Sequence, residues 1–377
     1  MQAGTKISLR QKAGAIIYDL PRFIRAMQPS SLNGPDSARW VYFCNRNEHL
    51  IAAPRLQGAM CDWQWTSDLY IAKVFPALGL QLMKRALMDW PITLLREPEG
   101  QIAPPDVSFI IGHRGQARLP HLLLTLQSLS AQRQVTFECI VVEQSVTPEI
   151  QSALPTWVRY VHTPLPQTDM PYCRSWAFNV GAQMARGPLL VLHDNDLLVP
   201  RDYAAQLMKR FNEGYEVINL KRFIFYLSEA HASRMLATQQ LLLNEAPESV
   251  MQNAQGGGSI AITRDAYFAI GGFDEAFIGW GGEDNEFWER ATTRRLWPYG
   301  YLPIVHIWHA AQPGKHDAQR QTASRFEQLS AIPTSERIAN LIAQNFASIE
   351  IRADGLNKTS VFSQKQTLFV RHDEIDY

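Results

Sequence analysis

Two short stretches contain residue types that suit a divalent metal ion. In "HDND", Asp194 and Asp196 lie one residue apart after an apolar run, so an extended chain directs both carboxylates to the same side. Hard oxygen ligands of this kind suit Mg²⁺ or Mn²⁺ held against a diphosphate. In "HIWH", His306 and His309 add imidazoles, which favour Mn²⁺ or Zn²⁺. Both stretches also have a structural interpretation, because acids often begin a loop and a histidine pair is often structural.

A third stretch, "GWGGEDNEFWER", combines bare backbone, a large ring and two acids at one turn. Gly281 and Gly282 let the backbone approach a ligand closely, and Trp280 offers a flat face on which a sugar ring can stack. Glu283 and Asp284 follow on the expected first turn of a helix, where the helix dipole favours the anionic form. A carboxylate held there can act as a general base toward a hydroxyl group. The alternative is an acidic turn that only caps its helix.

Composition narrows the class of protein. The 377 residues include 36 Lys and Arg against 36 Asp and Glu, so the formal net charge is zero and no nucleic-acid partner is expected. Hydrophobic residues make up 46%, which is enough for a sizeable core. The four cysteines form no C-x-x-C pair, and the amino terminus lacks the apolar centre of a signal peptide. We therefore expect a cytoplasmic protein without structural zinc, which contacts membranes at most peripherally.

The middle of the chain alternates strand-like and helix-like runs. The strand-like runs are short and apolar, and the runs between them repeat leucine or alanine at helical spacing: "VSFIIG", "RLPHLLLTLQSLSAQ", "FECIVVEQ", "RYVHT", "YCRSWAFNVGAQMARG" and "PLLVLHDND". This alternation predicts an α/β fold with a mostly parallel sheet. Ligands of such sheets bind beyond the carboxyl ends of the strands, where "GHRG" and "HDND" lie.

The flanking regions are less regular. Residues 1–100 contain one strand-like run, "RWVYFC", and one helix near 75–90, which we expect to pack on a core, and the proline-rich residues 96–106 form a linker. Residues 201–250 are predicted to be helical and aromatic. We expect three parts: an accessory region over 1–100, a catalytic domain over 101–320, and a C-terminal helix with a polar tail over 321–377.

The order of these motifs resembles that of inverting glycosyltransferases of the GT-A fold. The family 2 enzymes of the bacterial chondroitin-synthase type and the β-1,4-galactosyltransferase C-terminal type are the most similar, over roughly residues 105–318. The resemblance implies a Rossmann-like sheet flanked by helices, a Mn²⁺ or Mg²⁺ cofactor, a UDP-sugar donor and a saccharide acceptor. It further implies transfer of a hexose or N-acetylhexosamine, in bacterial surface polysaccharide or glycoconjugate synthesis.

The resemblance also assigns donor-side roles. It implies that His113 and Arg114 in "FIIGHRG" lie near the uridine diphosphate, and that Glu143 lies by the uracil or ribose. Arg174, in a helix that resembles the family's R-x-x-x-x-N-x-G pattern, faces the donor. "HDND" takes the place of the D-x-D motif, with Asp194 at the donor sugar or ribose. Gly112 stands where the family usually has proline.

On the metal and acceptor sides the implied roles come from later motifs. Asp196 and His309 fall on metal ligands, and His306 takes the position of a metal-binding methionine of the galactosyltransferases. Lys315 in "QPGK" is available to the phosphates. The remaining residues are implied to bind or deprotonate the acceptor: the glycine loop with Gly257 and Gly258, then Trp280, Gly281, Gly282, Glu283 as a contact of acceptor and donor, and Asp284 as the base.

Two other functions use the same residues. A metal-dependent hydrolase built from the acids and histidines needs neither Trp280 nor a nucleotide. A non-catalytic nucleotide-sugar-binding module keeps the fold, but both Asp196 and Asp284, which such a module can lose, are present. We hypothesise that residues 1–100 choose the acceptor or contact a membrane surface or a partner enzyme.

Overall fold

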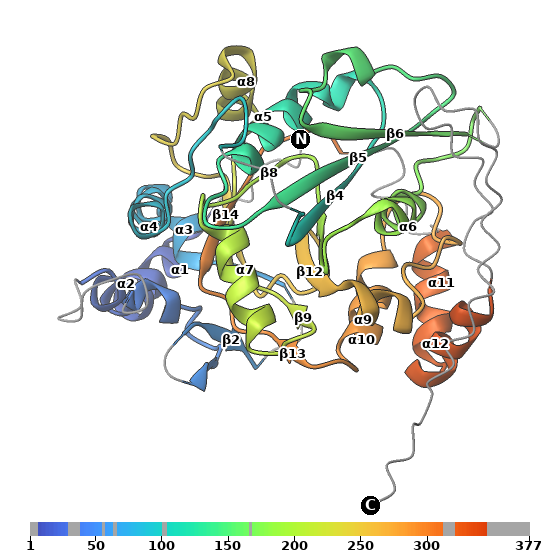
Figure 1. Cartoon of the computed structure of the whole chain (residues 1–377). Coiled ribbons are helices and arrows are strands. Elements are labelled where there is room, and N and C mark those ends of the chain that lie inside the picture. Colours follow the sequence, from blue (N-terminus) through green and yellow to red (C-terminus); the bar gives the residue numbers. More distant parts are fainter. Residues whose placement is uncertain are drawn as a thin grey trace, which may run out of the picture.

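The structure is a computed structural model that describes residues 7–28, 38–54, 57–62, 66–99, 104–165, 168–311 and 321–344. Its centre is a seven-stranded sheet in the order β13-β9-β12-β7-β4-β5-β6, with helices packed against it (Figure 1). The strands are β4 (Val107–His113), β5 (Phe137–Ser145), β6 (Val158–Pro164), β7 (Leu189–His193), β9 (Val217–Ile218), β12 (Ser259–Thr263) and β13 (Leu296–Trp297).

The central sheet is mostly parallel, as predicted. β4 pairs in parallel with β5 and β7, and β5 with β6 and β9 with β13 are also parallel pairs. Only β12 runs against its neighbours β7 and β9. Because β4, β5 and β7 are parallel, their carboxyl ends, which carry His113, Ser145 and His193, meet at one edge of the sheet.

A second sheet lies beside the first, in the order β3-β11-β10-β14-β8. Its strands are β3 (Ser67–Asp68), β8 (Leu197–Leu198), β10 (Lys221–Tyr226), β11 (Ser249–Gln252) and β14 (Leu302–His306), and β1 (Leu50–Ala52) pairs separately with β2 (Ala59–Cys61). β8 and β14 are antiparallel, with Leu197 opposite His306. This pairing brings "HDND" and "HIWH" together although more than a hundred residues separate them.

The helices surround both sheets and also form the two ends of the described chain. They are α1 (Leu9–Gly14), η1 (Ala15–Asp19), α2 (Leu20–Met27), η3 (Arg39–Tyr42), α3 (Tyr70–Val74), α4 (Pro76–Asp89), η5 (Gln116–Arg118), α5 (Leu119–Ser130), η6 (Gln151–Ala153), α6 (Arg174–Met184), α7 (Tyr203–Asn212), α8 (Glu229–Thr238), α9 (Arg264–Ala269), α10 (Glu283–Ala291), α11 (Gln321–Ser330) and α12 (Thr334–Ala343). Among the described residues, every helix is too short or too polar to cross a bilayer.

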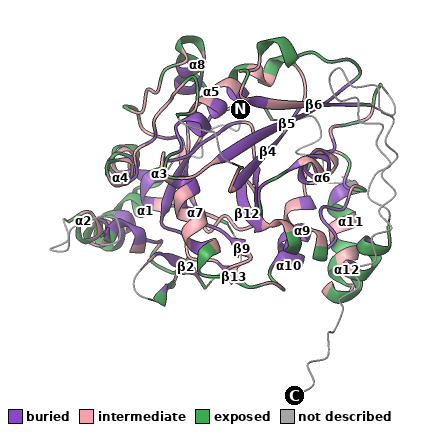
Figure 2. Ribbon diagram, viewed as in Figure 1, coloured by how far each residue is buried: buried purple, intermediate pink, exposed green. Residues whose placement is uncertain are grey.

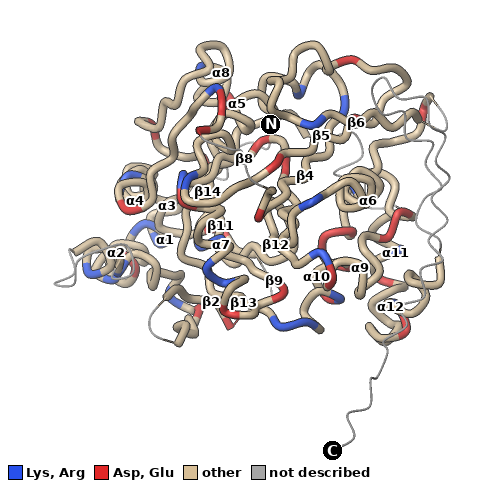
Figure 3. The backbone as a smooth tube through the Cα atoms, in the orientation of Figure 1, with Lys and Arg blue, Asp and Glu red and all other residues tan. Residues whose placement is uncertain are grey.

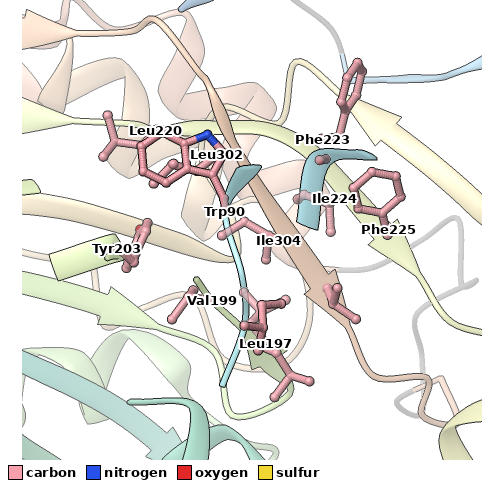
Figure 4. Close-up of a cluster of buried hydrophobic side chains, with 14 of the residues drawn as sticks. Trp90, Leu197, Val199, Tyr203, Leu220, Phe223, Ile224, Phe225, Leu302 and Ile304 are labelled. Carbon is pink, nitrogen blue, oxygen red and sulfur yellow. The ribbon is translucent and has the colours of Figure 1, made fainter. Parts of the chain in front are cut away.

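One large hydrophobic core joins the N-terminal hundred residues to the sheets (Figure 2). Trp40, Leu82 and Met83 belong to the same buried cluster as the strands β4, β7 and β10. Figure 4 shows Trp90 and Leu197 in one buried cluster with side chains of β10 and β14. Since Leu197 directly follows Asp196, this packing fixes the end of the "HDND" stretch.

Two local predictions were wrong. "RWVYFC" is not a strand: its first four residues form the 3-10 helix η3, because Trp40 packs into the core and donates a hydrogen bond of 2.7 Å from Nε1 to Oδ2 of Asp89. Residues 201–250 are helical only in α7 and α8, and "KRFIFY" forms β10 between β11 and β14. In both cases tertiary contacts outweigh the local conformational preference of the residues. The helix predicted near 75–90 is α4, and its apolar face is buried.

Close packing of α6 on β4 generates a prediction about stability. A Cβ added at Gly181 would lie 2.1 Å from Cγ2 of Ile110 and 3.3 Å from its Cβ. We expect Gly181→Ala to lower the free energy of unfolding by about 1–3 kcal/mol, measured by urea denaturation, because the buried helix must move.

The matched control is Gly14→Ala. Gly14 has helical φ −60°, and its added Cβ would meet only the flexible end of Arg46. This change should leave stability unaltered or raise it by about 0.5–1 kcal/mol. Equal stability of the two variants would show that α6 does not depend on the close approach to β4.

Candidate active site

A single cleft gathers almost all the polar residues singled out by sequence. It has a volume of about 2130 Å³ and opens beyond the carboxyl ends of β4 and β7. Its lining includes the residues Arg114, Arg118, Arg174, Asp194, Asp196, Gly257, Gly258, Trp280, Gly281, Gly282, Glu283, Asp284, His306 and His309. In Figure 3, acidic and basic segments adjoin between α6 and α10.

Asp196, His306 and His309 form a cluster whose ligand atoms all lie within 4.8 Å of one another. Nε2 of His309 is 3.3 Å from Oδ2 of Asp196, and Nε2 of His306 is 3.8 Å from Oδ1. Oδ1 of Asp196 is buried and accepts no hydrogen bond from the described residues. Burial lowers the pKa of His309, which favours the neutral imidazole that a metal ligand must be.

Arg118 holds the same carboxylate and was missed by sequence reasoning. It donates from Nη2 to Oδ2 of Asp196 at 2.5 Å and to Oδ1 of Asn195 at 3.3 Å. Burial alone would raise the pKa of Asp196, but the charges of His306 and Arg118 outweigh burial and lower it. The available signal was a second arginine, four residues after Arg114, in the loop that follows the first strand.

Arg174, the first residue of α6, contacts the other acidic residues of the cleft, which come from "HDND" and from the start of α10. Its guanidinium donates from Nε and Nη2 to Oδ1 of Asp194 at 2.9 and 2.6 Å. It also donates from Nη1 to Asp284, and Nη1 lies 3.8 Å from Oε1 of Glu283. One arginine therefore holds the carboxylates of two distant motifs in one group.

The two acids of α10 occupy a desolvated environment. Burial and the neighbouring Asp284 raise the pKa of Glu283 to about 7. Burial also raises the pKa of Asp284, although the charge of Arg174 opposes it. A carboxylate with a raised pKa is a stronger base at neutral pH, so both groups suit proton transfer.

Glycines bring the backbone close to these acids. A Cβ at Gly256 would lie 2.6 Å from the carbonyl oxygen of Asp284, and one at Gly257 would lie 3.0 Å from its Oδ2. Gly258, with φ +83°, accepts a hydrogen bond of 2.9 Å from the N–H of Asp194. The "GGGS" loop therefore spans the gap between Asp194 and Asp284.

The turn before α10 adopts backbone angles that favour glycine. Gly281 and Gly282 have φ of +98° and +89°, and the turn leaves Trp280 38% exposed on the wall of the cleft. Thr322 of α11 donates a hydrogen bond of 2.7 Å to the carbonyl oxygen of Trp280. The ring of Trp280 therefore forms part of the cleft wall while its backbone is held.

The two residues predicted after the first strand lie in different positions. His113 is fully buried, donates from Nε2 to the carbonyl of Gly115 at 3.0 Å, and accepts from Asn195 at 3.0 Å on Nδ1. His113 therefore holds the "HDND" loop in place from its buried side. Arg114 lines the cleft and donates to Gln144 and to the carbonyl oxygen of Met170.

Glu143 does not reach the cleft, in contrast to its predicted place beside the uracil or ribose. It is fully buried and accepts hydrogen bonds from Tyr160, Ser145 and the N–H groups of Glu149 and Ile150. These hydrogen bonds to the carboxylate of Glu143 hold the turn after β5. Lys315 lies outside the described residues.

Lys221 is a second charged residue that sequence reasoning missed. It begins β10, is almost fully buried, and donates from Nζ to the carbonyl oxygen of Ser259 at 2.7 Å. Burial lowers its pKa to about 7, although Asp284 and Asp194 oppose the shift. Its sequence context, an aromatic strand, gave no signal of this placement.

Two protein-family models match stretches of the chain that contain several of these motifs. Residues 116–270 match glycosyltransferase family 2, and residues 247–299 match a family described as the N-terminal domain of galactosyltransferase. Chondroitin synthase from Escherichia coli is 22% identical over 271 residues, which is 60% of this chain and 38% of that protein. A mannosyltransferase from Pyrobaculum calidifontis, solved with GDP-Man and Mn²⁺, is 16% identical with a TM-score of 0.38, over 71% of this chain and 81% of that one.

The buried Lys221 makes stability depend on pH. Its pKa is about 7 in the folded protein and 10.5 ordinarily, so between these values the unfolded chain holds one proton more. The free energy of unfolding should therefore rise by up to about 1.4 kcal/mol per pH unit between pH 7 and 10.5 from this group, and this gain is lost as pH falls from 10.5 to 7.

Lys221→Met removes this contribution. Urea denaturation at several pH values from neutral to alkaline should show a steeper rise for the wild type than for the variant. Lys73→Met, which removes an exposed lysine, should retain the wild-type slope. Equal slopes for the wild type and Lys221→Met would contradict the proposed burial of a neutral amine.

Proposed function

We propose that this glycosyltransferase, which contains a family 2 domain over residues 116–270, is a metal-dependent inverting enzyme that uses a UDP-sugar. It moves a hexose or N-acetylhexosamine to a saccharide hydroxyl group, for a bacterial surface polysaccharide or glycoconjugate. The observation that carries the proposal is the arrangement around Arg174, which places Asp284 in one cleft with the acid and histidine cluster. The similarity to chondroitin synthase, named for a polysaccharide, supports a saccharide acceptor.

The residues present fit a Mn²⁺ or Mg²⁺ ion. Asp196, His306 and His309 supply one carboxylate and two imidazoles within 4.8 Å, and Oδ1 of Asp196 is buried without a hydrogen bond. Two imidazoles favour Mn²⁺ over Mg²⁺. When bound, the ion would supply positive charge against the diphosphate of the donor. Asp196 and the two histidines would be its protein ligands.

The chain's own residues supply binding and proton transfer. Arg118, Arg114 and Asp194 line the cleft. In the proposed reaction the arginines offer positive charge to the diphosphate, and Asp194 contacts the sugar or ribose. Trp280 stacks on the acceptor, and Glu283 contacts acceptor and donor. Asp284 takes the hydroxyl proton as the acceptor oxygen bonds to the anomeric carbon. As this bond forms, the bond between the anomeric carbon and the diphosphate oxygen breaks, and UDP departs with the bonding electrons.

The N-terminal residues take part in the same cleft. Met60 and Thr66 lie on its wall, and β3 belongs to the sheet that holds β14. We infer that residues 1–100 form an accessory region that shapes the acceptor side. The catalytic part of the chain is then 101–320, and α11, in the C-terminal part from 321, contributes Phe326 and Ser330 to the cleft lining.

The nucleotide site is tested by calorimetric titration with UDP, with and without Mn²⁺. Wild-type protein should bind UDP tightly only with the ion, and Asp196→Ala should weaken binding at least about tenfold, because it removes the central ligand. Glu149→Gln, at an exposed acid, is the control. Binding of UDP that ignores both Mn²⁺ and Asp196 would exclude the metal-dependent site. An absence of UDP binding would favour a metal-dependent hydrolase.

The base is tested by Asp284→Asn, a change that keeps the shape of the side chain. We expect transfer, measured by release of UDP in the presence of an acceptor, to fall by about 10²–10⁴-fold, because the amide cannot accept the proton. Binding of UDP and Mn²⁺ should be retained. Asp265→Asn, at an exposed acid of α9, should keep full activity. Undiminished transfer by Asp284→Asn would assign the base elsewhere.

A further inference from the structure

The first described helices form a continuous rod that carries an unusual share of exposed apolar side chains. α1, η1 and α2 follow one another without a break from Leu9 to Met27. Among the described residues, eleven large apolar side chains are exposed, and five of them lie on this rod: Leu9, Ile16, Ile17, Tyr18 and Ile24. Leu9 is 85% and Ile17 63% exposed. The rod lies at the edge of the molecule far from α11 and α12 (Figure 1).

The rod is already anchored to the protein by a different face. Ala15, Asp19 and Phe23, spaced four residues apart, are buried. Phe23 packs edge-on against Phe43 at 5.4 Å. The exposed Leu9, Ile16 and Ile24 follow a spacing of seven and eight residues, which places them on another common side. The rod therefore has one apolar face toward the core and a second one that faces outward.

The outward side of the rod is cationic as well as apolar. Arg10, Lys12 and Arg25 are exposed along it. Its one acid, Asp19, is buried and lies 3.6 Å from Nη2 of Arg46, so the pair contributes no exposed negative charge. In Figure 3 basic residues mark α1 and α2. A surface with apolar side chains among cations is complementary to a layer that is apolar inside and anionic at its face.

We propose that the rod of residues 9–27 is an interfacial anchor that lays the protein on an anionic lipid bilayer. Ile16, Ile17 and Leu9 enter the boundary between headgroups and acyl chains, and Arg10, Lys12 and Arg25 contact the anionic headgroups. A symmetric pair of chains fits this surface less well, because it would set the cations of one rod against those of its copy. The inference does not use the cleft, so it stands apart from the proposed function.

The test is flotation of the full chain with vesicles of phosphatidylcholine alone and of an equal mixture with phosphatidylglycerol. The wild type should partition at least about tenfold more strongly onto the anionic vesicles, and added salt should weaken this partition. Ile16→Ser with Ile17→Ser, and separately Arg10→Gln with Lys12→Gln, should each reduce partition at least about tenfold. These side chains are exposed, so circular dichroism should show folded variants.

The matched control is Ile342→Ser on α12, which removes an equally exposed isoleucine from the other side of the molecule and should leave partition unchanged. The proposed anchor would be overturned if the wild-type protein bound neither kind of vesicle. It would also be overturned if the rod variants floated with the anionic vesicles as strongly as the wild type. Light scattering provides a second test of the anchor. A wild-type dimer that the Ile16→Ser and Ile17→Ser changes convert to a monomer would assign the rod to contact between copies.

Discussion

The short antiparallel contact between β8 and β14 is the constraint on which the site depends. It sets Leu197 opposite His306, and the N–H of Ile307 donates to the carbonyl oxygen of Asp196 at 2.9 Å. Two backbone contacts therefore fix Asp196 relative to both histidines. Leu197 belongs to the same buried cluster as Trp90 and side chains of β10 and β14, so the large core holds the metal-ligand cluster in place (Figure 4).

Charge balance is the second constraint, and Arg174 provides it. Asp194, Glu283 and Asp284 bring three acidic groups to one side of the cleft, and unpaired buried carboxylates are costly. Arg174 contacts all three, while Lys221 lies behind them in the second sheet. Burial raises the pKa of Glu283 and Asp284, and the charge of Arg174 opposes this rise. The contacts that stabilise the buried acids therefore also limit how far their pKa values rise.

The sequence allowed the fold class to be predicted, because it depends on local patterns. The same patterns identified many residues that line the cleft, and the roles of these residues stay predictions. Apolar runs ending in polar residues located the strand ends, and the glycines of "GWGGED" required a turn. Lys221 was missed because its role arises from pairing between distant strands, which leaves no local pattern. Arg118 was missed although the second arginine after the first strand was a signal, because its contact with Asp196 depends on the fold. Glu143 was misplaced for the same reason: its burial depends on Tyr160, a strand away.

Buried contacts join the described part of residues 1–100 to the rest of the protein. These contacts connect the rod of residues 9–27 with the residues that line the cleft. Trp40 and α4 belong to the main core, and Met60 and Thr66 line the cleft. Phe23 ties the rod of residues 9–27 to Phe43, which belongs to the same core. A bilayer bound by the outward face of the rod would therefore be rigidly placed relative to the acceptor side of the cleft. Acceptors attached to that bilayer would then approach the cleft in a restricted orientation, which lowers the entropic cost of transfer.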